Sequence, residues 1–109
     1  MDMTYKLVVY VPISHADVIR EAMGKAGAGR IGNYSFCSFS SRGIGRFRPE
    51  PGASPAIGEV GKMEQVEEER IEVICQQEIL KDVTAAVKKV HPYEEIAMEF
   101  YFEPMEMAY

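Results

Sequence analysis

The pattern of apolar and polar positions divides the chain into alternating predicted strands and helices. Residues 5–11 form a short, almost wholly apolar run, which is typical of a central strand. Residues 15–26 carry apolar side chains at helical spacing and end among glycines, and Ser14 with Asp17 has the spacing of a capping box. Residues 33–41, which are rich in aromatic side chains, predict a second strand.

The second half of the chain repeats this order after a long irregular stretch. Residues 42–63 hold five glycines and three prolines, which predicts a loop or a hairpin arm, and this segment is called the arm below. An acidic run at 64–70 leads into a predicted strand at 71–75. Residues 77–90 carry an apolar stripe at helical spacing, which predicts a second helix. In residues 96–103 two sets of side chains alternate along the chain, which is typical of a β-strand.

The order β-α-β-β-α-β is that of the split β-α-β, or ferredoxin-like, fold. We therefore predict an α+β domain over residues 1–109, in which two helices cover one face of an antiparallel four-stranded sheet. The other face would remain open. Because apolar side chains are expected there, we predict self-association through this face. These side chains are Val8, Tyr10, Phe39 and Ile74.

Composition narrows the function classes. The 12 basic and 17 acidic side chains of this 109-residue chain give a net charge of −5, which argues against nucleic acid or an anionic membrane as a partner. The chain begins without the basic and apolar stretch of a signal peptide, so we expect a cytoplasmic protein. Cys37 and Cys75 form no C-x-x-C pair and are expected to be buried thiols.

The two histidines are candidate metal ligands. His91 stands beside Glu94 and Glu95, and these are ligand types that suit a divalent metal ion. His15 is a further candidate, but the predicted topology would place it at the opposite end of the sheet from His91. The alternative is that His15 is a surface residue in the capping region of a helix and that His91 packs at a helix exit. Whether a divalent metal is a cofactor therefore stays open.

Three arginines concentrate positive charge in this acidic chain. Arg42, Arg46 and Arg48 surround Gly43 and Gly45, and glycine permits close approach of the backbone while arginine suits phosphate or carboxylate groups. One interpretation of this pattern is a site for a small anionic ligand. The alternative is a solvated strand edge that charge protects from pairing. The spacing is not that of a Walker loop, because no helix follows the glycines.

The remaining sequence patterns do not indicate a cofactor-binding or catalytic site. The string Gly27-x-Gly29-x-x-Gly32 follows a predicted helix instead of a strand, so it is not a dinucleotide fingerprint. Glutamates 67–69 predict a solvated strand edge, or partners for the arginines of the arm. The chain offers no Ser/His/Asp or Cys/His arrangement for nucleophilic catalysis.

Several blocks of the sequence resemble one known family. The chain resembles the insertion domain of the YqfO group in the NGG-interacting-factor family (Nif-three-like, GTP cyclohydrolase 1 type 2-like). The resemblance covers about residues 5–103, and the block at 91–95 is also similar to the end of the CutA divalent-ion tolerance proteins. The blocks that carry it are Tyr5–Pro12 with His15, Gly27–Tyr34 with Cys37, then Gly43, Phe47, Pro49, Gly58 and His91–Glu95.

This resemblance implies a PII-like or CutA-like fold, which commonly forms trimers. It also implies that the two-metal centre of the family lies in flanking parts that this chain does not contain, so we expect a module that stands alone and is not an enzyme. The first hypothesis is a regulatory or ligand-binding module with a small anionic ligand or a protein partner. The alternatives are a divalent-metal-binding protein resembling CutA and a small hydrolase.

Overall fold

The structure is a computed structural model of the 109-residue chain, and it describes residues 3–103. Two short 3₁₀ turns, η1 and η2, precede the two helices. The order of strands and helices confirms the predicted β-α-β-β-α-β arrangement. The elements are β1 (Thr4–Pro12), η1 (Ile13–His15), α1 (Ala16–Lys25), β2 (Phe39–Phe47), β3 (Glu64–Gln76), η2 (Gln77–Ile79), α2 (Leu80–Val90) and β4 (Met98–Glu103).

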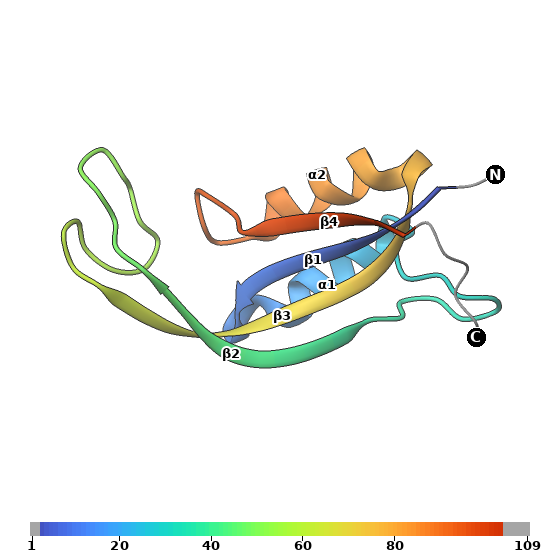
Figure 1. The fold of residues 1–109 in the computed structure, drawn as a ribbon, viewed down its shortest axis with the longest axis horizontal. Coiled ribbons are helices and arrows are strands. Elements are labelled where there is room, and N and C mark those ends of the chain that lie inside the picture. The colour runs from blue at the N-terminus through green and yellow to red at the C-terminus, as the bar shows by residue number, and fades with distance from the viewer. Residues whose placement is uncertain (1–2, 104–109) are drawn as a thin grey trace.

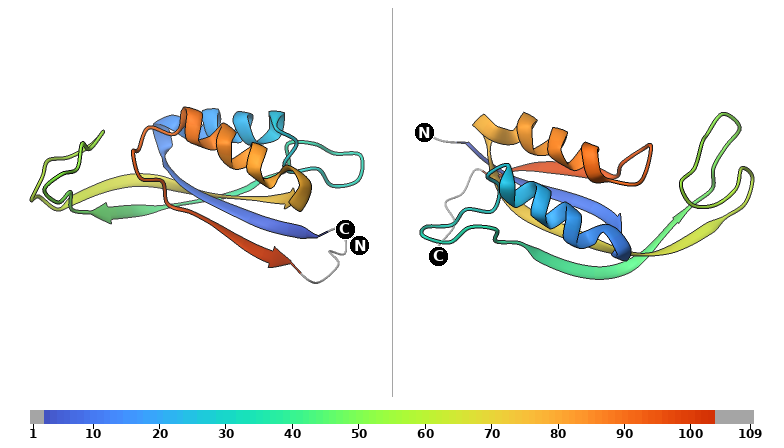
Figure 2. Two further views of the ribbon diagram at one scale, coloured as in Figure 1. Left: turned by 90° about the horizontal axis from the view of Figure 1, so that it is seen from above. Right: turned by 180° about the vertical axis from the view of Figure 1, so that it is seen from behind.

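The strands form one antiparallel sheet in the order β2-β3-β1-β4. Both helices lie on one face of this sheet and pack against each other, as Figures 1 and 2 show. The predicted α+β, ferredoxin-like fold is therefore confirmed. In this strand order, β1 and β3 are the central strands, and β2 and β4 are the two edge strands.

Alternate residues of the central strands build the core. Their side chains point toward the helices, and each fully buried aliphatic side chain contributes about 1.5–3 kcal/mol to the stability of the fold. Strand residues between them face the opposite side of the sheet. The core side chains are Leu7, Val9 and Val11 of β1, Ile71, Val73 and Cys75 of β3, Ile19 and Met23 of α1, and Val83 and Val87 of α2.

The second strand lies later in the chain than predicted. We expected a strand at 33–41, whereas β2 spans Phe39–Phe47 and most of the earlier segment is a loop. Phe36 has a positive φ of 58°, which ends any extended run there. Its ring lies against α1 at Gly24, where an added Cβ would overlap the ring. The aromatic side chain that suggested a strand therefore anchors a loop to a helix.

The start of the first helix also differs from the prediction. A 3₁₀ turn at Ile13–His15 leads into α1, and His15 occupies the N-cap position without a side-chain capping bond. Ser14 Oγ instead lies 2.8 Å from His15 Nδ1. Asp17 accepts a hydrogen bond from Arg20 at 2.6 Å. The predicted capping box is therefore wrong, because both of its side chains have other partners.

The open face of the sheet is more polar than predicted. Lys6 Nζ lies 3.8 Å from Glu72, and Arg70 donates to the same carboxylate at 3.2 Å. Val8, which we expected to be an exposed apolar residue there, is fully buried. Phe39 is 68% exposed, as expected. Charged pairs thus cover the middle of this face, and exposed aromatic side chains lie toward its edges.

The paired strands β2 and β3 continue past the end of β1 and carry the loop of the arm away from the body (Figures 1 and 2). The described part of the chain measures 47 × 23 × 23 Å, and its radius of gyration of 15.0 Å exceeds the roughly 13 Å expected for a sphere-like domain of this length. None of its helices is both long and apolar enough to span a membrane.

Candidate functional site

The end of α2, the end of β1 and the base of the arm meet at one end of the sheet. Nε2 of His91 lies 2.8 Å from the backbone carbonyl of Tyr10, two residues before β1 ends. This contact contradicts the expectation that His15 and His91 lie at opposite ends. Because β3 runs antiparallel to β1, α2 begins at the start of β1 and returns to its end. Burial is the main cause that lowers the pKa of His91, and the positive charge of His15 lowers it further.

His91 is fixed by two backbone hydrogen bonds. Its Nδ1 accepts the N–H of Tyr93 at 3.1 Å, while its Nε2 faces the carbonyl of Tyr10. An N–H can only donate and a carbonyl can only accept, so the neutral ring with its proton on Nε2 satisfies both. Burial lowers the pKa of His91, which favours this neutral form. In this arrangement neither ring nitrogen presents a lone pair to a metal ion.

The other candidate metal ligands have separate surroundings. Glu94 accepts the backbone N–H of Ser54 at 2.9 Å, and His15 Nδ1 lies 2.8 Å from Ser14 Oγ. Glu95 is exposed. Within residues 3–103, no three His, Cys, Asp or Glu side chains are arranged to hold a metal ion. The structure therefore brings the candidates to one end of the molecule without forming a ligand set.

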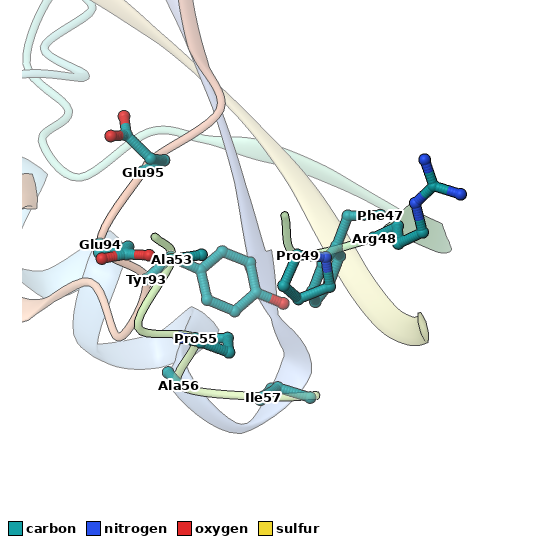
Figure 3. Close-up of a pocket in the computed structure, with 10 residues that line it drawn as sticks. All are labelled: Phe47, Arg48, Pro49, Ala53, Pro55, Ala56, Ile57, Tyr93, Glu94 and Glu95. Atoms are coloured by element: carbon teal, nitrogen blue, oxygen red, sulfur yellow. The ribbon is translucent and has the colours of Figure 1, made fainter. Parts of the chain in front are cut away.

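Tyr93, which sequence reasoning did not single out, holds the arm against the body. Its hydroxyl donates to Glu68 of β3 at 2.9 Å, and its ring meets the ring of Phe47 edge-on at a centroid distance of 5.9 Å. Burial and the hydrogen bond to Glu68 raise the pKa of Tyr93, so the phenol remains protonated as a donor. Figure 3 shows the Tyr93 ring surrounded by residues of the arm.

A mainly apolar hollow of about 260 Å³ lies between the arm and the turn that joins α2 to β4 (Figure 3). Apolar side chains and alanines form most of its wall, and three charged residues contribute at its margin. The size fits one ring system or a short aliphatic group. The lining residues are Phe47, Arg48, Pro49, Ala53, Pro55, Ala56, Ile57, Tyr93, Glu94 and Glu95.

The arginines of the arm lie on or directly after the edge strand β2 and are exposed. Arg42 faces Glu69 in the register with β3, but the carboxylate of Glu69 is held by Arg20 at 2.6 Å. Arg46 faces the neutral Gln65. In the described part of the chain, Arg42 and Arg46 therefore take part in no ion pair.

The predicted anion site is divided between two places. Arg48 lines the hollow and pairs with the exposed Glu50 at 2.9 Å. Arg42, Gly43 and Gly45 line a shallow depression on the sheet, next to Tyr10 and Arg70. The glutamates at 67–69 lie on β3 opposite β2, and among the described residues they form no ion pair with these arginines. They are not a fully solvated edge either, because Glu69 is buried.

Comparison with known proteins identifies relatives of the chain. No family model matches it. A protein of Halalkalibacterium halodurans described as a GTP cyclohydrolase 1 type 2 homolog is 55% identical over 97 residues, which are 89% of this chain and 26% of that protein. A Bacillus subtilis protein of the same description is 52% identical over 96 residues, which are 88% of this chain and 26% of that protein. The chain thus spans about a quarter of the length of these relatives.

Solved structures agree with this relationship. A Bacillus cereus protein related to NIF3 matches with a TM-score of 0.83 and 44% identity, over 95% of this chain and 26% of that one. The periplasmic divalent cation tolerance protein CutA of Archaeoglobus fulgidus matches with a TM-score of 0.69 and 19% identity, over 98% of this chain and 88% of that one, which shows a shared fold alone. The chain is therefore a homologue of one segment of the GTP cyclohydrolase 1 type 2 homologs of the NIF3-related (YqfO) family, with a CutA-like, PII-like fold.

Proposed function

We propose that the chain is a regulatory ligand-binding module, not an enzyme, and that its arm binds a small anion with an apolar or aromatic body. Arg46 and Arg48 hold the anionic group, and the hollow beside them receives the body of the ligand. The observation that carries this proposal is that Arg48 lines the apolar hollow while Arg46, two residues before it, is exposed and has no carboxylate in ion-pair contact among the described residues.

The spacing of the arginines supports this assignment. A strand rises about 3.3 Å per residue, so Arg46 and Arg48 are separated by about 7 Å along the chain and can converge on one phosphate or carboxylate. Arg42 and Arg46 are about 13 Å apart by the same measure, which is too far for one small anion. The pair Arg48–Glu50 is exposed. Exposed pairs contribute little, so an anionic ligand can displace Glu50.

Thermal unfolding with a ligand panel tests this proposal. ATP, ADP, adenosine and inorganic phosphate would be compared at equal ionic strength, because an anion with an aromatic body should stabilise more than either part alone. A ligand at a hundredfold excess over its Kd raises the free energy of unfolding by about 2.7 kcal/mol, which is a shift of several degrees in Tm.

The variants Arg46→Ala and Arg48→Ala should lose this shift. Arg30→Ala is the matched control, because Arg30 is exposed and lies outside the hollow. If no compound of the panel raises Tm, or if Arg30→Ala removes the shift equally, the arm is not the anion site.

We also propose that the chain forms a homo-oligomer, and the resemblance to CutA and PII-like proteins favours a trimer. β4 supports this proposal, because it is an edge strand and its Phe100, Tyr101 and Phe102 are each about half exposed. Light scattering during size-exclusion chromatography should then give three times 12.3 kDa. Phe102→Ser should reduce this mass, whereas Met63→Ser, at an exposed position on the arm, should not. A monomer at all concentrations would refute the proposal.

We also propose that the chain is located in the cytoplasm. Cys37 and Cys75 are both free thiols, which fits a reducing compartment. Cell fractionation with a tagged chain, followed by alkylation of free thiols in each fraction, tests this placement, and recovery from an oxidising compartment would contradict it.

A further inference from the structure

The margin of the hollow that lies away from Arg48 carries negative charge. Glu94 and Glu95 belong to the turn that joins α2 to β4, and both line the hollow together with Arg48 of the arm. Figure 3 shows Glu94 on one side of the Tyr93 ring and Arg48 on the other. The hollow therefore has a cationic margin and an anionic margin, with an apolar wall between them. A bare anion at Arg48 would use only the first of these margins.

Glu94 retains acceptor capacity for a ligand. Its Oε1 accepts the backbone N–H of Ser54 at 2.9 Å, which positions the carboxylate against the arm. An ionised carboxylate has about four acceptor positions, and this bond uses one of them. Neither Glu94 nor Glu95 takes part in an ion pair within residues 3–103. Glu94 thus combines a defined position with a charge that no neighbouring cation in this range neutralises.

The rest of the wall offers little polar recognition. Between the two margins it consists of phenylalanine, proline, alanine, isoleucine and tyrosine side chains. The one hydroxyl among these lining side chains, that of Tyr93, already donates to Glu68 at 2.9 Å. Ligands of similar size are therefore distinguished mainly at Arg48 and Glu94. Because an ionised carboxylate only accepts hydrogen bonds, the ligand must present a donor to Glu94.

We propose that the ligand of the hollow is a purine nucleotide whose ring carries an amino group, and that Glu94 selects it by accepting an N–H of this group. The phosphate meets Arg48, and the ring lies against the apolar wall. A purine without the amino group would cover the carboxylate and leave it without a hydrogen-bond partner, which costs binding energy. This inference rests on the proposed function, because it names the class of ligand that the same site takes.

Two matched pairs of nucleotides test this selection on the full chain. ATP and purine riboside triphosphate differ only in the 6-amino group, and GTP and ITP differ only in the 2-amino group. Isothermal titration calorimetry should show at least about tenfold tighter binding of the aminated member of one pair, because a hydrogen bond to a charged group is stronger than a neutral one. The pair that shows this preference identifies the edge of the ring that faces Glu94.

The variant Glu94→Ala separates recognition of the ligand from support of the arm. It should bind both members of the preferred pair equally, because the acceptor is gone. If Glu94 acted only by holding Ser54, the variant would bind both members more weakly and keep the tenfold preference, which would overturn the inference. Glu59→Ala is the matched control and should keep the preference, because it removes an exposed carboxylate that does not line the hollow. Circular dichroism checks that each variant is folded.

The remaining outcomes separate this inference from the proposed function. Arg48→Ala should weaken binding of all four nucleotides, because each of them carries the same triphosphate. Equal binding within both pairs, together with this effect of Arg48→Ala, would overturn the inference and leave the anion site of the proposed function intact. Binding of none of the four nucleotides would overturn both. Loss of the preference in Glu59→Ala as well as in Glu94→Ala would show a general effect of charge and would also refute selection by Glu94.

Discussion

Arg20 on α1 and Glu69 on β3 form a 2.6 Å ion pair across 49 positions of the sequence. The guanidinium also donates to Ser40 of β2 at 3.0 Å, so one side chain ties the first helix to two strands. Hydrogen bonds to Asp17 and Glu69 raise the pKa of Arg20. Glu69 is only 8% exposed, so Arg20 supplies the hydrogen bonds that water would otherwise donate to its carboxylate.

Removal of the negative charge from this pair should destabilise the fold. Glu69→Gln keeps an amide oxygen that can accept from Arg20 but removes the buried negative charge. We expect a loss of about 1–3 kcal/mol in the free energy of unfolding, because a charge-assisted bond becomes a neutral one while Arg20 remains partly solvated. Urea unfolding monitored by circular dichroism measures this loss. Glu67→Gln, at an exposed position on the same strand, should change the free energy by less than about 0.5 kcal/mol. Equal effects of the two substitutions would show that the pair contributes nothing specific.

Gly24→Ala should destabilise the chain, although alanine usually stabilises a helix over glycine by about 0.5–1 kcal/mol. The reason is that the added methyl group would overlap the ring of Phe36. The double variant with Phe36→Ala should recover the normal preference for alanine. Urea unfolding of the two single variants and the double variant gives their coupling, which we expect to be about 1–2 kcal/mol. A coupling near zero would mean that Phe36 does not pack on α1.

The elements that the sequence predicted well are those with one buried face. β1 is a short apolar run, β3 and β4 alternate, and both helices carry apolar stripes, because each of these elements buries side chains against the core. β2 has no such signal, since it is an edge strand with exposed side chains on both faces, including Phe39 and Arg42. The aromatic Phe36 was assigned to a strand because composition does not reveal that it packs on Gly24.

The candidate site was predicted less completely, because its contacts join distant segments. The arginines of the arm and the block at 91–95 were visible as clusters in the sequence. The partner of His91 is a backbone carbonyl of Tyr10, which no side-chain pattern can indicate. Tyr93 and Glu68 are 25 residues apart, and only the antiparallel course of β3 and α2 brings them together.

The two thiols should differ in reactivity. Burial raises the pKa of Cys75 to about 11, so at pH 8 about 0.1% of this thiol is ionised, and its side chain is 1% exposed. Cys37 is partly exposed. Iodoacetamide at pH 8 should therefore label one site, and peptide mass spectrometry should find it at Cys37. The variant Cys37→Ser should remain unlabelled under native conditions, and rapid labelling of this variant would show that Cys75 is accessible.

The stability contributed by His91 should decline in acid. Burial lowers its pKa in the folded state below the value of about 6.5 that it has when unfolded. The unfolded chain then binds more protons, so the free energy of unfolding falls as the pH drops below about 6.5, and the loss is complete below the folded-state pKa. Because Nδ1 accepts the N–H of Tyr93, a proton on Nδ1 also removes a hydrogen bond.

The variant His91→Asn isolates this effect from the titration of carboxylates. Its side chain does not titrate, so the difference in unfolding free energy between wild type and variant should shrink as pH falls from 7.5 to 5. Urea unfolding at several pH values measures this difference. The comparison variant His15→Asn retains His91 and should therefore keep the acid-dependent loss of stability. A difference that stays constant with pH for His91→Asn would contradict a buried neutral imidazole.

Two glycines on β2 offer a matched test of the contact between the arm and the body. A Cβ at Gly45 would overlap the carboxylate of Glu68, whereas a Cβ at Gly43 meets nothing within 4 Å. Glu68 is the acceptor for the hydroxyl of Tyr93. We therefore expect Gly45→Ala to displace Glu68 from Tyr93 and to lower the free energy of unfolding by about 1 kcal/mol, the usual net contribution of one hydrogen bond.

Gly43→Ala should be neutral or slightly stabilising, because it reduces the entropy of the unfolded chain without a steric conflict. The decisive comparison adds Gly45→Ala to Tyr93→Phe. Without the phenol hydroxyl, Glu68 has no hydrogen bond to Tyr93 to lose, so Gly45→Ala should lower the free energy of unfolding of Tyr93→Phe only slightly. Urea unfolding measures this free energy, and hydrogen exchange across residues 48–63 reports on the arm. If Gly45→Ala costs the same in both backgrounds, its effect arises from the strand itself, and the hydrogen bond between Tyr93 and Glu68 does not hold the arm.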